Sequence, residues 1–432
     1  MLKRKIIRDL ELWHNESRKK ALLLKGARQV GKTTTVREFA KSHYEHFVEI
    51  NFEKLPMVRQ AFDGNLDADT IISKLSLMGF GPFVERKTLV FFDEIQTCPN
   101  ARTAIKFLVE DGRYDYIESG SLLGLNYADV SSYPVGFENS VHMYPLDFEE
   151  FLWAKGVTEP ITEAVKNTLH NRMPVDDFMH EQLSRYYREY LIAGGMPEVV
   201  NTYLHHADFA KTLQVQRSIT DSYRDDIAKY AGPEKARAKL FFDAIPSELS
   251  KEKKRFVIAD IEQKATAKKY EDAAQWLIDA GIAYLSYNTH DLLLPFEQYE
   301  NRNLYKVFLI DTGLLCSMWR EPIQWEVLNG NIDINEGALT ENYVAAELIK
   351  KGYSLHYYDR KSRQELDFLI ARNNKIHIIE VKSGNDYMRH ASLDSAIESS
   401  NPSLGESMVV SKFPMQKVGD IQYVPLYALG WI

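Results

Sequence analysis

A glycine-rich segment near the start of the chain limits the fold more than any other feature. Residues 26–33 spell Gly-Ala-Arg-Gln-Val-Gly-Lys-Thr, the Gly-x-x-x-x-Gly-Lys-[Ser/Thr] pattern, between the apolar run at 21–24 and a predicted helix. Backbone N–H groups of such a loop point inward, and the following helix N-terminus adds positive potential for phosphate. The segment therefore predicts a P-loop in a parallel α/β sheet.

The residue types of this loop predict ATP and Mg²⁺ as its ligands. Gly26 and Gly31 keep β-carbons out of the loop, Lys32 is expected to bridge the β- and γ-phosphates, and Thr33 to offer its hydroxyl to Mg²⁺. The predicted nucleotide-binding residues are Gly26, Ala27, Arg28, Gln29, Val30, Gly31, Lys32, Thr33, Thr34, Asp93, Ser119 and Ser121.

A second motif completes the predicted site. Residues 89–94 read Leu-Val-Phe-Phe-Asp-Glu, an apolar strand that ends in two carboxylates. We expect Asp93 to hold Mg²⁺ through water and Glu94 to polarise the attacking water. This pair suits water activation better than capture of an acceptor hydroxyl, which makes a kinase the weaker hypothesis. Ser119 or Ser121, after the next strand, is expected to sense the γ-phosphate; a simple glycine-containing turn is the alternative.

Short apolar runs alternate with helical stretches over the first third of the chain, which is typical of a parallel sheet. Strands are predicted at 21–24, 47–52, 89–92 and 114–117. A helical, aromatic-rich stretch follows, then a hairpin near 283–296, and a new strand and helix pattern begins after about residue 330. The predicted domains are 1–145, 146–232, 233–330 and 331–432.

Length and charge bound the class of protein. A chain of 432 residues exceeds one ordinary core, and a net charge of −8 argues against wholesale coating of nucleic acid but allows a local basic groove. The two cysteines, Cys98 and Cys316, have no disulfide-framework or zinc spacing, which favours a reducing cytoplasm. No run approaches the roughly twenty apolar residues that span a bilayer, so we expect no membrane association.

The C-terminal quarter carries a second set of chemical residues. Asp367 lies on one predicted strand, Glu380 and Lys382 lie two apart on the next, and a helical Glu341 precedes them. Residues two apart in a strand share a face, so these groups can fix a divalent cation and a water for phosphodiester cleavage. Metal ligands are predicted at Glu341, Asp367 and Glu380, with Asp367, Glu380 and Lys382 as catalytic residues. A plain Glu380–Lys382 salt bridge, or a catalytically silent module, are the alternatives.

Basic residues near these segments are candidates for phosphate contacts, although such charges also form ordinary solvated faces. They are Arg360, Lys361, Arg363 and Arg389 around the acidic set, and Lys264, Lys268 and Lys269 with Tyr270 in the segment before it.

Five strings together carry a resemblance to a known family. They are residues 22–34, 92–96, 119–121, 144–151 (Tyr-Pro-Leu-Asp-Phe-Glu-Glu-Phe) and 194–197 (Gly-Gly-Met-Pro). The chain resembles prokaryotic AAA-type ATPases with a DUF4143 C-terminal region over nearly its whole length. The resemblance implies an α/β fold: a P-loop parallel-sheet AAA-like core with a helical lid, a winged-helix segment, and a C-terminal α/β domain similar to PD-(D/E)XK nucleases. It also implies a homo-oligomer.

Two functional hypotheses follow. In the first, an ATPase binds DNA and uses its nucleotide state to control a nuclease-like domain. In the second, a regulatory or scaffold ATPase carries a C-terminal domain that cuts nothing and binds DNA or a partner. Many relatives carry a Gly-Arg pair where this sequence has Val135-Gly136-Phe137, so Arg113, Arg188 and Arg224 are the substitutes for an arginine acting in trans.

Overall fold

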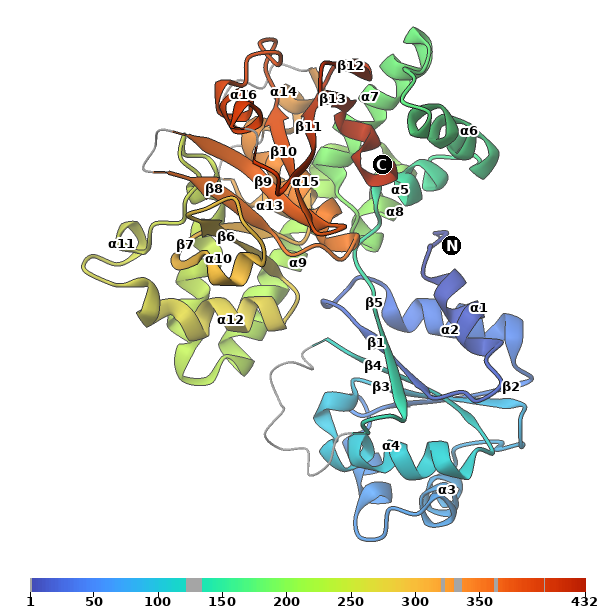
Figure 1. Ribbon diagram of the computed structural model, residues 1–432. Helices are drawn as coiled ribbons and strands as arrows, with labels where there is room; N and C mark the ends of the chain where they lie inside the picture. The colour runs from blue at the N-terminus through green and yellow to red at the C-terminus, as the bar shows by residue number, and fades with distance from the viewer. Residues whose placement is uncertain (1, 122–133, 320–322, 330–335, 361–363, 400) are drawn as a thin grey trace. The chain divides into compact units, whose positions relative to one another are not determined.

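The computed structural model describes residues 2–121, 134–319, 323–329, 336–360, 364–399 and 401–432 (Figure 1). The chain divides into two compact units. The first consists mainly of Lys3–Tyr144, and the second mainly of Pro145–Ile278 and Ile282–Ile432. Each unit has its own sheet, and each is considered by itself below.

The first unit is built on a five-stranded, all-parallel sheet of order β2-β3-β4-β1-β5. This confirms the predicted parallel α/β core. Its strands are β1 Ala21–Lys25, β2 His46–Asn51, β3 Thr88–Asp93, β4 Asp115–Gly120 and β5 Glu138–His142. Its helices are α1 Ile7–His14, α2 Lys32–His43, α3 Ala68–Leu77 and α4 Pro99–Asp111, with short 3-10 turns at Pro56–Phe62 and Ile95–Thr97.

The central strands of this sheet are buried on both faces. Leu23 and Phe92 belong to the apolar cluster on one face, and Leu24 and Phe91 to the cluster on the other. Two buried faces explain why these strands are continuous apolar runs and therefore detectable in sequence. Strand β5 was not predicted, because its residues are polar and partly exposed rather than apolar.

The second unit combines helices with a mixed eight-stranded sheet of order β12-β13-β11-β10-β9-β8-β6-β7. The strands are β6 Ala283–Thr289, β7 Glu300–Leu309, β8 His356–Asp359, β9 Glu365–Arg372, β10 Lys375–Lys382, β11 Leu404–Ser411, β12 Gln416–Val418 and β13 Ile421–Pro425. The helices are α5 Phe148–Ala154, α6 Glu159–His170, α7 Asp177–Ala193, α8 Pro197–His206, α9 Phe209–Tyr230, α10 Lys235–Leu249, α11 Ile258–Ile261, α12 Glu271–Asp279, α13 Thr312–Met318, α14 Gln324–Asn329, α15 Glu336–Lys350 and α16 Ala391–Glu398.

This second sheet includes strands from both sides of the predicted boundary near residue 330. Strand β6 pairs antiparallel with β7 and parallel with β8. The predicted hairpin range near 283–296 contains only β6 and the loop after it, because the second strand, β7, begins at Glu300. Both strands continue the C-terminal sheet. The boundary residues 330–335 lie outside the described part of the chain.

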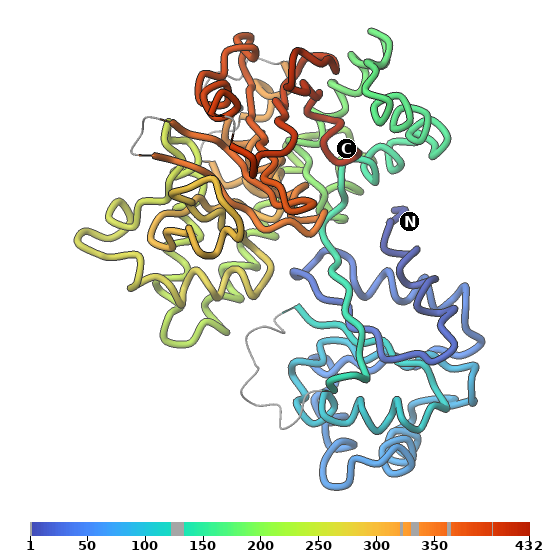
Figure 2. Tube along the Cα trace, in the orientation of Figure 1, coloured from blue at the N-terminus to red at the C-terminus, as the bar shows by residue number. Residues whose placement is uncertain are grey.

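The chain passes from β5 into α5 through the Pro145-Leu146 segment, a course that can be followed along the tube in Figure 2. The Leu146 N–H donates to the Gly195 carbonyl at 2.7 Å, and the Tyr190 hydroxyl donates to the Leu146 carbonyl at 2.7 Å. The Asp311 carboxylate in turn accepts the N–H groups of Gly195 at 2.6 Å and Leu314 at 2.9 Å. The Gly-Gly-Met-Pro motif is therefore a structural joint between three segments.

Two further findings concern the cysteines and the possibility of a membrane-spanning helix. Both cysteines are buried and neither forms a disulfide. Among the described residues, no helix combines the length and apolarity needed to cross a membrane.

We expect Gly195→Ala to destabilise the second unit. A β-carbon at this position would lie 2.0 Å from the Leu146 carbonyl oxygen, which is backbone and has little freedom to move away. Overpacking of this kind costs about 1–3 kcal/mol. Thermal unfolding followed by circular dichroism should show a lower melting temperature.

Gly384→Ala is the matched control. A β-carbon at Gly384 meets nothing within 4 Å, so its melting temperature should stay close to that of the wild type. Equal stability of both variants would contradict the close backbone approach.

Candidate functional site

The loop between β1 and α2 has the geometry of a phosphate cradle. Gly26 has φ 151°, and a β-carbon there would lie 2.2 Å from the Met143 carbonyl oxygen. Gly31 has φ 99° and caps the N-terminus of α2. Both conformations favour glycine. Because α2 begins at Lys32, its first backbone N–H groups lack partners within the helix and face the end of the loop.

The Lys32 side chain folds back over this loop. Its Nζ donates to the Gly26 carbonyl at 2.9 Å and to the Ala27 carbonyl at 2.8 Å, and the side chain is buried. Burial lowers the pKa of Lys32 to about 8, although Glu94 and Asp93 favour its charged form. The ammonium group of Lys32 thus donates to neutral carbonyl groups. Charged phosphate oxygens at the same place would accept stronger hydrogen bonds.

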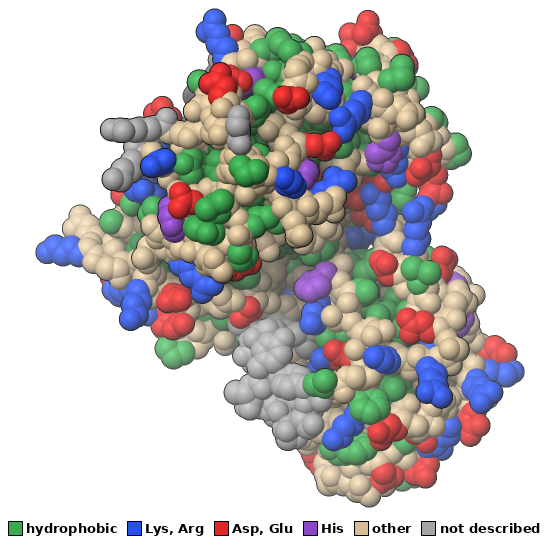
Figure 3. All heavy atoms as spheres, viewed as in Figure 1, with side chains coloured by type: hydrophobic (Ala, Val, Ile, Leu, Met, Phe, Trp, Pro, Cys, Tyr) green, Lys and Arg blue, Asp and Glu red, His purple; other side chains and the backbone are tan. Residues whose placement is uncertain are grey.

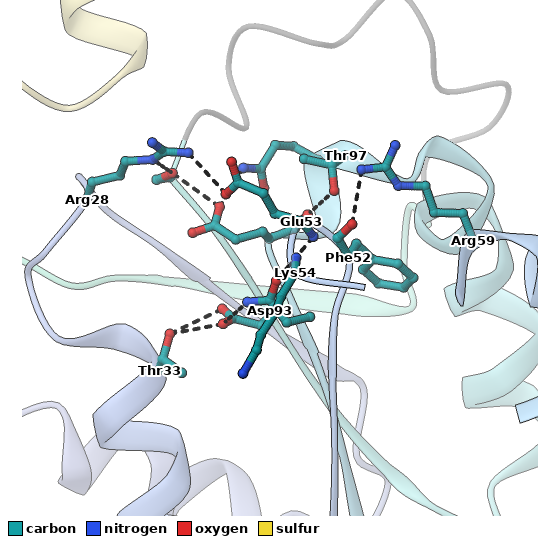
Figure 4. Close-up of polar contacts among 12 residues, drawn as sticks. Arg28, Thr33, Phe52, Glu53, Lys54, Arg59, Asp93 and Thr97 are labelled. Atoms are coloured by element: carbon teal, nitrogen blue, oxygen red, sulfur yellow. Dashed lines mark hydrogen bonds and ion pairs between the residues drawn. The ribbon is translucent and has the colours of Figure 1, made fainter. Parts of the chain in front are cut away.

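The buried carboxylate of Asp93 is the centre of the site (Figure 4). The Thr33 hydroxyl lies 3.1 Å from Oδ2 and 3.3 Å from Oδ1 of Asp93. The Asn51 amide donates to Oδ2 at 2.8 Å, and the Ser119 hydroxyl donates to Oδ1. Three predicted residues, Thr33, Asp93 and Ser119, therefore meet at one point, and hydroxyl and carboxylate oxygens are suitable Mg²⁺ ligands.

The neighbouring Glu94 has a constrained backbone and a fixed carboxylate. Its φ of 54° and ψ of 46° lie in the left-handed region, which is unusual for a residue with a side chain. The Gln96 amide donates to Oε2 of Glu94 at 2.6 Å, and the Ser121 hydroxyl donates at 3.3 Å. Ser121 also accepts from Arg28 Nε at 3.4 Å, so a loop residue reaches the same group. Figure 4 shows Arg28 directed toward Glu53 as well, at 3.3 Å.

The remaining predicted loop residues have more peripheral positions. Gln29 is exposed with φ 66°, and Thr34 is exposed in the first turn of α2. Val30 is buried, and its carbonyl accepts Arg4 Nη1 at 2.9 Å. Arg4 also donates to the Tyr144 carbonyl at 2.6 Å, and so ties the loop to the end of the first unit.

Three residues near the site were not predicted from the sequence: Asn51, Gln96 and Arg4. Asn51 ends β2 and lies opposite Asp93 in the parallel register. The carboxyl ends of parallel strands meet at one edge of the sheet, so a polar residue closing an apolar strand was the signal for Asn51. Gln96 follows the carboxylate pair by two residues. Arg4 had no signal, since its partners are backbone carbonyls of distant segments.

The second unit brings the C-terminal candidates together. Asp367 on β9 accepts the Val381 N–H of β10 at 2.9 Å. Lys382 donates to Glu380 at 2.7 Å on the same face of β10. Glu341, buried on α15, is close enough to raise the pKa of Asp367. The predicted set Glu341, Asp367, Glu380 and Lys382 is therefore a real cluster.

Two lysines that were not predicted share this cluster. Lys306 on β7 is buried, and its Nζ lies 3.1 Å from Glu365, 3.6 Å from Glu341 and 3.8 Å from Asp367. Lys254 donates to Glu341 at 2.5 Å. Within the described ranges, no group of three or more His, Cys, Asp or Glu side chains has an arrangement that could hold a metal ion. An ammonium group therefore lies beside two of the residues that were predicted as metal ligands, Glu341 and Asp367.

The same cluster favours a protonated Asp367. Burial raises the pKa of Asp367 to about 8, helped by Glu380 and Glu341 and opposed by Lys306. Burial also acts against the ionised form of Glu341, but Lys306 and Lys254 outweigh it and lower the pKa of Glu341. The pKa values of these two neighbouring carboxyl groups are therefore shifted in opposite directions.

Comparison with known families places these two sites in different domains. Residues 18–152 match the family model of an AAA domain, and residues 336–429 match a domain of unknown function, DUF4143. Two separate regions of the chain are therefore similar to an AAA domain and to the DUF4143 domain. Residues 184–324, between them, match a further domain of unknown function, DUF8612. The P-loop site lies within the AAA match, whereas Lys306 lies in the DUF8612 match and its acidic partners lie in the DUF4143 match.

Individual proteins that are similar to this chain share little sequence identity with it. An uncharacterized protein of Haemophilus influenzae is 23% identical over 320 residues, which cover 69% of this chain and 67% of that protein. Among solved structures, ORC1 of Aeropyrum pernix in complex with DNA matches with 12% identity and a TM-score of 0.30, over 73% of this chain and 91% of that chain. Cdc6p of Pyrobaculum aerophilum matches with 12% identity and a TM-score of 0.27, over 77% and 96%. A katanin structure matches with 18% identity and a TM-score of 0.22, over 35% of this chain and 50% of that chain.

The predicted basic residues have mixed surroundings. Arg360 is exposed, and Arg389 is exposed beside Asp386 at 3.6 Å. Lys264 and Lys268 are exposed, while Lys269 pairs with Glu262, which also accepts the hydroxyl of the buried Tyr270 at 3.0 Å. Lys361 and Arg363 lie outside the described residues.

The three arginine candidates also differ. Arg113 pairs with Asp69 at 2.6 Å and with Asp111 at 2.8 Å. Arg224 lies 2.8 Å from both Asp221 and Asp243. Arg188 is half-buried and its Nε has no hydrogen-bond partner. Arg113 and Arg224 thus each pair with two carboxylates, whereas Arg188 has a guanidinium nitrogen without a hydrogen-bond partner.

The pKa of Lys32 predicts that ATP affinity falls as the pH rises above about 8. Bound phosphate favours the charged ammonium, so binding above this pH requires uptake of a proton. ATP affinity should then fall by up to about tenfold for each pH unit, as long as the pH stays below the pKa that Lys32 has when ATP is bound. Titration with a fluorescent ATP analogue between pH 7 and 10 measures the slope.

Lys32→Arg is the control, because arginine stays protonated over this range. Its affinity should be lower or equal at pH 7 but nearly independent of pH. Parallel slopes for the two proteins would contradict titration of Lys32.

Proposed function

We propose that the AAA domain binds ATP with Mg²⁺ and hydrolyses it. The observation that carries this proposal is the convergence of Thr33, Asn51 and Ser119 on the buried Asp93, next to a fixed Glu94. This arrangement provides oxygen ligands for a hard divalent cation and a carboxylate beside them that can accept a proton.

Each residue has a defined part in the proposed reaction. Lys32 exchanges its loop carbonyls for phosphate oxygens and stabilises negative charge in the transition state. Thr33 and Asp93 would hold Mg²⁺, which supplies neutralisation of phosphate charge when bound. Glu94, oriented by Gln96, accepts a hydrogen bond from the attacking water and aligns it with the γ-phosphorus. Ser121 and Arg28 are placed to respond to the γ-phosphate through the same carboxylate.

Two variants separate binding from chemistry. Lys32→Ala should weaken ATP binding by about 10- to 100-fold, because a charge-assisted contact is lost. Glu94→Gln should leave ATP bound while phosphate release falls by about 10²–10⁴-fold, as expected for loss of a general base. Nucleotide binding and steady-state phosphate release measure the two effects.

Glu110→Gln makes the same chemical change on the exposed surface of α4 and serves as control. Its turnover should match the wild type. Normal turnover in Glu94→Gln would overturn the assignment of the base.

For the C-terminal domain we infer a role in binding rather than cutting, under the control of the nucleotide state. Lys306 supports this choice, because its ammonium group already lies among the carboxylates that a catalytic metal ion would need. DNA is the partner that we propose, with Lys264, Lys268 and Arg360 as exposed basic candidates. Figure 3 shows Lys and Arg interspersed with Asp and Glu over the viewed face, so the proposed contact is local.

This proposal predicts DNA binding without cleavage. The protein should retard linear DNA in a gel, more weakly as salt rises, since phosphate contacts release counterions. Linear and supercoiled DNA should stay intact in Mg²⁺ or Mn²⁺, with and without ATP. Joint Lys264→Ala and Lys268→Ala substitution should weaken retardation, whereas the exposed Lys417→Ala should not.

Cleavage that disappears in both Asp367→Ala and Lys382→Ala would instead establish the nuclease hypothesis. If the protein does not bind DNA at low salt, the DNA proposal is wrong. The scaffold hypothesis with a protein partner is then favoured.

Self-association is also part of the proposal. An arginine from a neighbouring copy would complete the AAA site, and Arg188 is the candidate because its Nε is unengaged. Light scattering with and without ATP tests this directly, and a monomer in both conditions would count against it.

A further inference from the structure

The acidic cluster of the second unit is largely buried, except at Glu365. Glu341 and Glu380 are each 7% exposed at the side chain, Asp367 is 15% exposed, and Glu365 is 38% exposed. Carboxylates removed from water need counter-charges or hydrogen bonds, because desolvation otherwise makes the ionised forms costly. The source of those counter-charges therefore decides the chemistry of this cluster.

Three lysines supply the counter-charges, and they differ in position. Lys382 pairs with Glu380 at 2.7 Å and is 29% exposed. Lys254 pairs with Glu341 at 2.5 Å and is 17% exposed. Lys382 and Lys254 therefore lie at the solvent-accessible edge of the cluster. Lys306 is only 2% exposed and contacts carboxylates from three places: Glu365, Glu341 and Asp367.

The position of Lys306 is fixed by the sheet. Its strand β7 pairs with β6, with Lys306 opposite Ser286. Its Nζ lies 5.1 Å from the centre of the Tyr357 ring, whose π-electrons also favour a cation. An aromatic ring, a strand register and three carboxylates thus hold one ammonium group at the centre of the cluster.

A divalent cation would need the same oxygens. Metal ligands lie about 2.0–2.6 Å from Mg²⁺ or Ca²⁺, so an ion bound to Asp367 and Glu341 would lie close to the Lys306 ammonium. Two cations at that separation repel strongly in a buried site. A divalent metal and the ammonium group of Lys306 would therefore compete for these oxygens.

We propose that the ammonium group of Lys306 is the resident cation of this cluster, and that a divalent metal binds there only when Lys306 is removed. The side chain belongs to the segment before the DUF4143 match, so the site is completed from outside that domain. This inference concerns the second unit alone and does not depend on ATP hydrolysis.

The test is Mn²⁺ binding to the full-length protein without nucleotide, measured by electron paramagnetic resonance. The site is identified as the Mn²⁺ binding that Asp367→Asn abolishes. Wild type should show no such component. Lys306→Met, which keeps the length but removes the charge, should gain one, with affinity at least about tenfold above that of wild type. Mn²⁺ should also raise its melting temperature.

Lys254→Met is the matched control. It also removes a cation that contacts Glu341, but it leaves Lys306 in place, so no Asp367-dependent Mn²⁺ site should appear. A component in wild type that Asp367→Asn removes would overturn the proposal. So would a folded Lys306→Met protein with no gain of Mn²⁺.

Lys306→Met leaves buried carboxylates uncompensated, so its stability is followed in parallel. Unfolding that Mn²⁺ reverses supports the proposal, because the metal then replaces the lost charge. If the variant stays unfolded with Mn²⁺, Lys306→Gln provides a neutral side chain that can still donate hydrogen bonds, and the same two outcomes apply to it. An Asp367-dependent Mn²⁺ component in wild type overturns the proposal even if neither variant folds.

Discussion

The nucleotide site depends on one buried carboxylate, that of Asp93. An ionised group at this depth is costly unless several donors surround it. The donors come from α2, β2 and β4, through Thr33, Asn51 and Ser119. The strands β2 and β4 therefore have to end, and α2 has to begin, at the same edge of the sheet. The parallel register satisfies this requirement, since Asn51 lies opposite Asp93 and Leu24 lies opposite Ser119.

The second unit solves a similar problem with different chemistry. Its sheet also buries acidic groups, but Lys306, rather than a set of neutral donors, lies at their centre. The same strand leads on to Asp311, whose carboxylate holds the Gly195 joint. One strand thus supplies the cation of the cluster and leads directly into the anchor of the segment that enters the unit.

Much of the first unit could be predicted from the sequence, because its strands are buried on both faces and its loop has a fixed pattern. The Leu-Val-Phe-Phe-Asp-Glu motif placed Asp93 and Glu94 correctly beside the loop. The polar strand β5 gave no periodic signal. Asn51 could be recognised only from its place at the end of an apolar strand that lies beside the strand of Asp93. In the second unit, Asp367 and Glu380 follow a local spacing, whereas Lys306 comes from a strand some sixty residues earlier, and no local pattern specifies that pairing.

The pairing of β6 with β8 has a consequence for the inheritance of this protein. The DUF8612 and DUF4143 matches meet between residues 324 and 336, yet hydrogen bonds of a single sheet cross that line. A gene fusion or truncation at this point would leave β6 and β8 each with a bare edge, which is a template for aggregation. It would also separate Lys306 from the carboxylates that surround it. Recombination should therefore transmit the two regions as one piece, whatever their separate names.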